Sequence, residues 1–256
     1  MTNPLSTDHL NFFRDNGYLI LRGVLDPALM AQARDSWWAA APPELIRDDP
    51  ETWVGAFADS RWTWKYREDQ DRPWLIDLLA GNATLRAAAT QLLGPELEAA
   101  ERVRGIYLVF PEGDVPERPV RLHVDQHPFH LGAVAYIDDV PPGGGGFTVW
   151  PGSHKRFYPT FRTAYTFNPV DTSQEFREQP AWQEVSQQEP VGTYGRAGDV
   201  VLWHHRLGHS AGHNRSRQVR QAVLYDFKRT DLAAVQDEPT PDNMWRDWPG
   251  ITEAAG

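Results

Sequence analysis

At 256 residues, of which 41% are hydrophobic, the chain is long enough for a well-buried core, so a globular protein is expected. A formal net charge of −10 argues against nucleic acid and anionic membrane surfaces as partners, because both bind basic protein surfaces. The absence of cysteine excludes disulfides and thiolate zinc sites, and no apolar run approaches the roughly 18 residues of a membrane span. Since no signal peptide is recognisable, we expect a soluble, cytoplasmic protein.

The N-terminal segment predicts a helix, a strand and a second helix. The first helix is expected over Thr7 to Asn16, with Thr7 as its cap and Gly17 at its end. The apolar run from Tyr18 to Leu21 predicts a strand. Asp26-Pro27 has the residue types that begin a helix, which we expect to continue to about residue 40.

Aromatic residues alternate in the polar segment 44–72, at Trp62, Trp64 and Tyr66. A period of two predicts a strand or extended loop with one aromatic face, and such a face suits an apolar or ring-bearing small molecule. Trp64 is therefore a candidate substrate contact. A further helix is expected over Leu85 to Leu93, because Gly94-Pro95 follows it.

From about residue 103 the sequence consists of short apolar segments separated by turn residues. Strands at this spacing indicate an antiparallel sandwich or barrel, so the predicted fold class is mainly β with flanking helices. We expect a single domain over 1–256: helical support and an aromatic loop in 1–100, a β core in 103–228 and a C-terminal tail in 229–256. Residues 156–190 are interpreted as an insertion, a lid with a short helix at Gln174 to Glu178. The predicted strands are Arg104 to Phe110, Val120 to Asp125, Leu131 to Ile137, Gly146 to Trp150, Asp199 to His204 and Val219 to Phe227.

The sequence Leu122-His123-Val124-Asp125 indicates a metal site. Side chains two apart on a strand share a face, so His123 and Asp125 can reach one ion, with Cα atoms roughly 6–7 Å apart. His127 would lie roughly 13 Å from His123 in an extended strand, too far for a third ligand when metal–nitrogen bonds are about 2 Å. The third ligand must come from another strand. Spacing alone does not rank the four histidines available there, which are His204, His205, His209 and His213.

Three longer runs resemble the phytanoyl-CoA dioxygenase family. Gly146 to Lys155 resembles its Gly-containing turn with the PGSHK signature, and Phe13 to Leu25 its usual opening. Gly198 to His204, with Arg206 to Ser216, resembles its distal segment, and all runs fall in the family's order. The resemblance implies a double-stranded β-helix (jelly-roll, cupin-like) core. It also implies Fe(II) as metal, 2-oxoglutarate as co-substrate and O2 as oxidant.

The resemblance implies His123, Asp125 and His209 as iron ligands and catalytic residues. Two histidines and one carboxylate on one face of an ion hold non-haem Fe(II) and leave positions open for O2 and a co-substrate. The resemblance also implies Arg220, eleven residues past His209, as the partner of the far carboxylate of 2-oxoglutarate. His213 stands where the family usually has Pro or another small or polar residue, so it receives no role.

Further candidate contacts come from neighbouring strands. Thr148 and Trp150 share one strand face and are expected to point into the barrel, Thr148 toward the co-substrate and Trp150 toward the substrate. Tyr107 can donate its hydroxyl to 2-oxoglutarate. For each of these three residues, core packing is the alternative. His127 is a candidate at the substrate mouth, with an exposed loop position as its alternative.

The resemblance implies that 2-oxoglutarate is decarboxylated to succinate and CO2 while a C–H bond of a small molecule is oxidised. Asp125 favours hydroxylation or another C–H oxidation, because halogenating relatives have a small residue in place of this carboxylate. Two alternatives are a metal-dependent non-oxygenase enzyme and a metal-free binding module on the same barrel; Arg220 and the complete ligand set argue against them. The expected substrate is a small molecule such as a natural-product intermediate, and the expected assembly is a monomer or homodimer.

Overall fold

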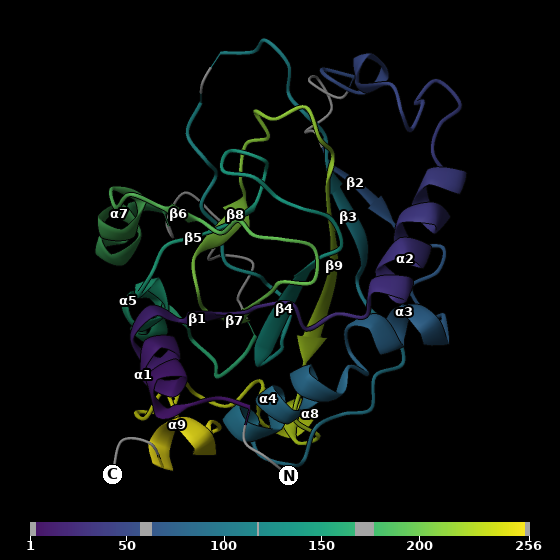
Figure 1. Cartoon of the computed structure of the whole chain (residues 1–256). Helices are drawn as coiled ribbons and strands as arrows, with labels where there is room; N and C mark the ends of the chain where they lie inside the picture. The colour runs from purple at the N-terminus through teal and green to yellow at the C-terminus, as the bar shows by residue number, and fades with distance from the viewer. Residues whose placement is uncertain (1–3, 57–62, 117, 167–176, 254–256) are drawn as a thin grey trace.

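The computed structural model describes residues 4–56, 63–116, 118–166 and 177–253 (Figure 1). Within these residues, two antiparallel sheets form the centre of the fold, a six-stranded sheet in the order β1-β7-β4-β9-β3-β2 and a three-stranded sheet in the order β6-β5-β8. This arrangement confirms the predicted fold class, mainly β with flanking helices. The strands are β1 (Tyr18–Leu21), β2 (Thr63–Tyr66), β3 (Gly105–Val109), β4 (Leu131–Tyr136), β5 (Phe147–Val149), β6 (Val191–Gly192), β7 (Val200–His204), β8 (His209–Ala211) and β9 (Arg220–Phe227).

The first two helices match their predicted positions. Helix α1 (Thr7–Asn16) ends at Gly17, whose φ of 78° is the left-handed conformation that glycine adopts without strain. Its cap differs from the prediction, because the cap residue is Ser6 and not Thr7. The Ser6 hydroxyl accepts a hydrogen bond from the His9 backbone N–H, and the His9 ring accepts one from the Ser6 backbone N–H. Helix α2 (Pro27–Ala39) is capped by Asp26 as expected.

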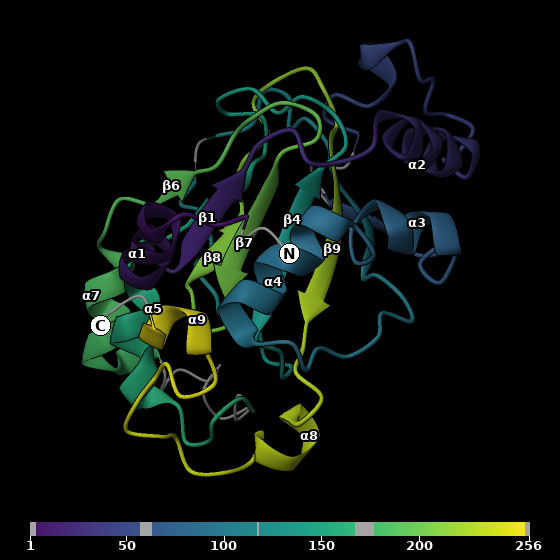
Figure 2. The same cartoon turned by 60° about the horizontal axis from the view of Figure 1, so that its bottom comes forward.

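Helices α2, α3 and α4 cover one face of the larger sheet, as Figure 2 shows for α4 in front of β4 and β9. Helix α4 (Ala83–Leu93) begins two residues before its predicted start, because Asn82 caps it. Helix α3 (Pro73–Leu78) was not predicted, and its single run of six residues is too short to show helical periodicity. The other helical segments are η1 (Pro50–Thr52), α5 (Ser153–Phe157), η2 (Tyr158–Thr160), α7 (Pro180–Ser186), α8 (Leu232–Val235) and α9 (Pro249–Glu253).

Side chains alternate along β9 between two separate cores. Val223 and Tyr225 pack in the cluster under the helices, whereas Ala222 and Leu224 pack in a second cluster that also holds Phe147 of the smaller sheet. The second cluster therefore lies between the two sheets. Because alternate residues of a strand share a face, the ends of β9 also present side chains to this inner space, Arg220 at its start and Asp226 near its end.

The strand predicted over Val120 to Asp125 is wrong. This segment is a loop that meets β8 only through an isolated antiparallel bridge between His123 and His209. Pro119 and Pro128 flank it, and proline cannot donate a ladder hydrogen bond, so continuous pairing is not available there. The alternation expected of a strand persists, since Leu122 and Val124 are buried while His123 is exposed.

Two predictions fall wholly or partly outside the described residues: Trp62, and most of the short helix at Gln174 to Glu178. Helix α7 lies within the insertion and packs on α5 at its start, where Phe157 of α5 stacks on Trp182 of α7. No helix in the described part of the chain combines the length and apolarity needed to cross a bilayer.

Candidate functional site

Three side chains from two distant segments meet beside the smaller sheet. The backbones of His123 and His209 exchange hydrogen bonds of 3.1 and 2.9 Å, which places the His-x-Asp loop beside the first residue of β8. One ligand atom each of His123, Asp125 and His209 lies within 4.8 Å of the other two. Among the described residues, this is the one group of three or more such side chains arranged to hold a metal ion.

Both imidazoles present the same nitrogen to this group. Nδ1 of His209 lies 2.8 Å from the carbonyl oxygen of Leu207, and Nδ1 of His123 lies 3.4 Å from that of Arg121. When Nδ1–H donates to a carbonyl, the proton is fixed there and Nε2 keeps a free lone pair. Nε2 of His209 lies 3.6 Å from a carboxylate oxygen of Asp125, so these two ligand atoms face one another.

Electrostatics favour the protonation states that a metal needs. Burial, together with the neighbouring His123, lowers the pKa of His209 to about 4, so its ring is neutral near pH 7. Burial alone would raise the pKa of Asp125, but His209 and Arg104 outweigh it and hold that pKa below its usual range. Neutral imidazole and ionised carboxylate are the forms that bind Fe(II), so the donor set fits that ion.

Arg220 is a buried cation at the start of β9. Its Nε donates to the carbonyl of Gly145 at 2.9 Å, and one terminal nitrogen donates to that of Tyr107 at 3.3 Å. No ion pair between described residues involves its guanidinium. Burial lowers its pKa to about 10, which still leaves it charged at pH 7. A buried cation without a protein carboxylate suits an anionic partner that enters from outside, such as a dicarboxylate.

Thr148 and Trp150 do not point into the space between the sheets as predicted. Phe147 and Val149 occupy that space, and Thr148 and Trp150 are one residue out of phase with them. The indole of Trp150 packs with Leu122 and other residues of a separate cluster behind the His-x-Asp loop. Thr148 bonds back to the carbonyl of Gly146 at 3.3 Å.

Tyr107 lies on the inner face of β3 and is surrounded by cations. The Nζ atom of Lys65 is 5.0 Å from its ring centroid and the guanidinium of Arg104 is 5.7 Å away. Burial alone would raise the pKa of Tyr107, but Arg104, Arg67 and Lys65 outweigh it and lower the pKa. Tyr107 therefore faces the site side of the larger sheet, as its prediction requires.

Trp64 lies on the opposite face of the sheet from Tyr107. Its ring meets Trp37 of α2 edge-on at 6.1 Å, within the core under the helices. The structure does not bring Trp64 to the metal group, because the aromatic alternation at this strand marks the helix-covered face. His127, in contrast, lies on the site side, where Nε2 contacts a carboxylate oxygen of Asp226 at 2.7 Å.

The other candidate histidines lie elsewhere. His204 and His205 are buried beside one another, with ring centroids 4.4 Å apart, and His204 stacks on Trp248 at 4.9 Å. His213 contacts the buried carboxylate of Glu112 at 2.6 Å. Only His209 of the four candidates joins His123 and Asp125.

Two charged residues at the site carried no predicted role. Arg104 places one terminal nitrogen 3.2 Å from Asp125 and 3.4 Å from Asp226, and so joins a candidate ligand to the inner face of β9. A signal for Asp226 was present, because its even spacing from Arg220 puts both on one face of the same strand. The predicted strand includes Arg104, but the observed strand begins at Gly105, so alternation along the strand does not fix the direction of the Arg104 side chain.

The chain belongs to the phytanoyl-CoA dioxygenase (PhyH) family, whose profile matches residues 13–222. Membership confirms the resemblance inferred from the sequence runs. Among curated proteins, none matches the chain.

Solved structures with this fold include EctD from S. alaskensis with bound Fe, with a TM-score of 0.60 and 19% identity, covering 95% of this chain and 83% of that one. SnoK, a non-heme alpha ketoglutarate dependent carbocyclase from nogalamycin biosynthesis, has a TM-score of 0.56 and 22% identity, covering 95% and 97%. HygX from Streptomyces hygroscopicus, with nickel and 2-oxoglutarate bound, has a TM-score of 0.56 and 17% identity, covering 93% and 97%. The jelly-roll core and the expected class of cofactors, iron with 2-oxoglutarate, are thereby confirmed for the family.

Proposed function

We propose that this protein is an Fe(II)- and 2-oxoglutarate-dependent oxygenase that oxidises a C–H bond of a small molecule and releases succinate and CO2. The observation that carries the proposal is the meeting of His123, Asp125 and His209 within 4.8 Å, in protonation states suited to a divalent ion. Bound iron would supply the activation of O2 that such an oxidation requires. His123, Asp125 and His209 are the proposed ligands.

The chain's own residues hold and orient the reactants. The carbonyls of Leu207 and Arg121 fix the two imidazoles with Nε2 toward the ion. Arg104 holds a carboxylate oxygen of Asp125, which restricts rotation of that ligand. We propose that Arg220 binds the far carboxylate of 2-oxoglutarate, because a buried guanidinium held by two carbonyls is already oriented for a paired contact.

Hydroxylation is the proposed outcome. Halogenation would require a small residue at the position of Asp125, which instead supplies a carboxylate. A metal enzyme that uses no keto acid would not need the buried cation that Arg220 supplies. The solved structures of the same fold include a carbocyclase, so oxidative ring closure, which removes two hydrogen atoms from the substrate, is the second candidate. Mass spectrometry of the product separates them, since hydroxylation adds one oxygen atom and ring closure removes two hydrogen atoms.

Anaerobic titration tests the cofactor assignment before any substrate is known. Fe(II) and 2-oxoglutarate together should give a weak visible charge-transfer band toward the red, which neither component gives alone. The His209→Ala protein should lose this band and release no succinate in air, because two of three ligands do not hold the ion at the required geometry.

His9→Gln is the matched control, since His9 lies on α1 away from the metal group and glutamine can serve at this position of a capping box. It should keep both the band and succinate release. Full turnover by His209→Ala would remove His209 from the ligand set, and a wild type without the band would refute the oxygenase proposal.

A further inference from the structure

Cationic side chains gather at one end of the larger sheet because three neighbouring strands meet there. Strands β9, β3 and β2 are adjacent and antiparallel, so the ends of β9 and β2 lie beside the start of β3. Arg67 follows β2 directly, Arg102 comes shortly before β3, and Lys228 follows β9. Residues more than 150 positions apart in the sequence are thus brought to one edge.

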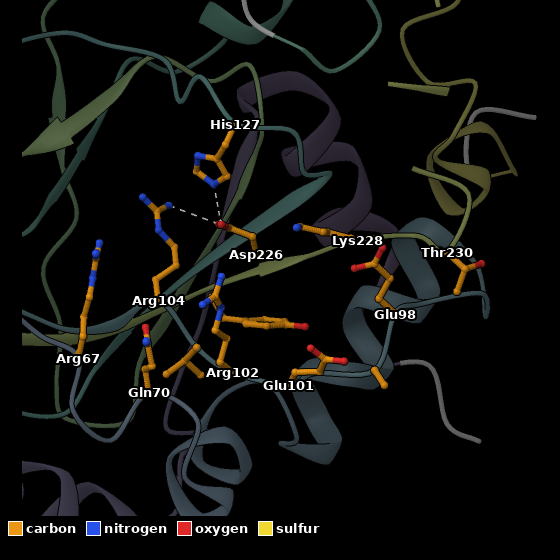
Figure 3. Close-up of a pocket in the computed structure, with 13 residues that line it drawn as sticks. Arg67, Gln70, Glu98, Glu101, Arg102, Arg104, His127, Asp226, Lys228 and Thr230 are labelled. Atoms are coloured by element: carbon orange, nitrogen blue, oxygen red, sulfur yellow. Dashed lines mark hydrogen bonds and ion pairs between the residues drawn. The ribbon is translucent and has the colours of Figure 1, made fainter. Parts of the chain in front are cut away.

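These residues line a cleft of about 860 Å³, drawn in Figure 3. That volume lies in the range of small-molecule sites. Its walls are mostly polar, and the apolar lining is limited to Ala99, Val103 and the aromatic Tyr225. The remaining lining is Arg67, Gln70, Glu98, Glu101, Arg102, Arg104, His127, Asp226, Lys228 and Thr230.

The cleft adjoins the proposed metal site through Arg104. One nitrogen of Arg104 contacts both Asp125 and Asp226. His127 contacts the other oxygen of Asp226, and Figure 3 marks the contacts of Asp226 with Arg104 and His127. A molecule in the cleft would therefore lie one side chain away from the ion that Asp125 would hold. The cleft is therefore the candidate entrance for the substrate of the proposed oxygenase.

The four cations that line the cleft differ in whether a carboxylate pairs with them. Arg104 is already neutralised by two carboxylates. Among the described residues, no carboxylate pairs with Arg67, Arg102 or Lys228. The acidic residues Glu98 and Glu101 line the same cleft, and Figure 3 shows Glu98 beside Lys228 and both acids away from Arg67. The lining thus holds four cations, Arg67, Arg102, Arg104 and Lys228, against three carboxylates, Glu98, Glu101 and Asp226. In a chain of net charge −10, this local excess of one positive charge favours an anion over a neutral molecule.

Backbone hydrogen bonds hold the cleft in shape. Val103 donates to the carbonyl of Gln70 at 2.8 Å, Arg104 to that of Leu224 at 2.7 Å, and Glu98 to that of Lys228 at 2.9 Å. The segments that carry the cations are thus fixed to one another before any ligand arrives. A backbone that is already ordered lowers the entropy cost of binding a ligand.

We propose that the substrate is a small molecule with an anionic group, a carboxylate or a phosphate, bound by Arg67, Arg102 and Lys228. This inference rests on the proposed oxygenase function and names the substrate class of the same site. It replaces the apolar or ring-bearing molecule expected from the aromatic alternation, because Trp64 lies under the helices and not in the cleft.

A paired panel of compounds tests the inference with the iron-loaded protein, 2-oxoglutarate and air. One arm holds hydroxycarboxylic and N-acetylamino acids with their methyl esters; the other holds sugar phosphates and nucleoside monophosphates with their dephosphorylated partners. A third set holds neutral terpenoid alcohols and aromatic ketones. Succinate release should be stimulated by anionic members of one arm, with KM at least on the order of ten-fold lower than for the uncharged partner.

Arg102→Gln should raise the KM of the stimulating anion on the order of ten-fold, leave kcat within about two-fold, and leave the KM of the uncharged partner unchanged. Arg47→Gln, which removes an exposed guanidinium paired with Asp35, is the matched control and should change neither constant. Equal KM values for Arg102→Gln and the wild type would overturn the assignment of this residue.

The two proposals fail in different ways. A wild type that shows the anaerobic band but is stimulated only by neutral compounds, or by no anion of either arm, refutes the anionic substrate while the oxygenase stands. A wild type without the band refutes the oxygenase and, with it, this inference.

Discussion

The side chain of Arg104 joins the candidate metal ligand Asp125 to the wall of the cleft. Its guanidinium sits 3.2 Å from the candidate ligand Asp125 and 3.4 Å from Asp226 on the cleft wall. Burial opposes the charge of Arg104, but the two carboxylates outweigh it and raise the pKa above its ordinary value. The cation is therefore permanent, and together with His209 it keeps the pKa of Asp125 below its usual range.

Replacing Arg220 by lysine keeps the charge and removes the planar fork. The expected result is a KM for 2-oxoglutarate roughly ten- to a hundred-fold higher, because one charge-assisted hydrogen bond contributes about 1.5–3 kcal/mol. Steady-state succinate formation against 2-oxoglutarate concentration measures it. Arg217→Lys, on the exposed turn before β9, is the control and should leave KM unchanged. A KM within two-fold of wild type in Arg220→Lys would exclude paired recognition by Arg220.

The three candidate ligands differ in the signal that predicts them. Spacing predicts His123 and Asp125, whereas His209 is predicted only by the resemblance of its segment to the family, because spacing leaves four histidines open. The structure excludes His204 and His205, which pack against Trp248 and Tyr165. Packing of this kind depends on contacts far along the chain, so no local pattern could have ranked these histidines.

At the level of elements, the junction of α1 and β1 depends on glycine. Gly17 has a φ of 78°, and a Cβ built there would lie 2.5 Å from Nδ1 of His154 and 2.9 Å from Leu207. Gly23, after β1, has a φ of 62° but no atom within 4 Å of a built Cβ. Both positions require the left-handed backbone conformation, but only Gly23 has space for a Cβ atom.

Gly17→Ala should therefore destabilise the protein more than Gly23→Ala does. The left-handed conformation alone costs an alanine about 1–2 kcal/mol, and overpacking at Gly17 adds roughly 1–3 kcal/mol. Urea denaturation gives the free energy of unfolding for each. Equal losses in the two variants would show that His154 and Leu207 move aside freely.

At the scale of the whole molecule, four buried histidines form no ion pair with a carboxylate of the described residues: His130, His154, His204 and His205. They form a continuous set of ring contacts, from His154 through His204 and His205 to Tyr165 and His130. Burial lowers the pKa of His130 to about 4 and that of His154 to about 3. Burial also holds the pKa values of His204 and His205 well below their usual range.

The free energy of unfolding should fall between pH 6.5 and 4.5. In the unfolded chain these histidines take up protons below about pH 6.5, whereas in the folded chain they stay neutral to lower pH. The unfolded state then binds more protons, so stability is full above pH 6.5 and decreases by up to about 1.4 kcal/mol per pH unit for each histidine. Chemical denaturation of the metal-free protein at pH 7, 6 and 5 measures the slope. A free energy that stays constant over this range would contradict neutral burial.

Local sequence determined the elements and the chemistry they carry. Caps, glycines and two-residue alternation predicted α1, α2, β1, β3, β4, β7 and β9, because these signals depend on neighbours within a turn or a strand. Tertiary structure decided which face of each strand meets which layer. In the folded chain Trp64 faces the helices, and Thr148 and Trp150 face away from the space between the sheets. A single cleft is lined by Arg67, Arg102 and Lys228. Alternation fixes that residues share a face, but only the packing of distant segments fixes what that face contacts.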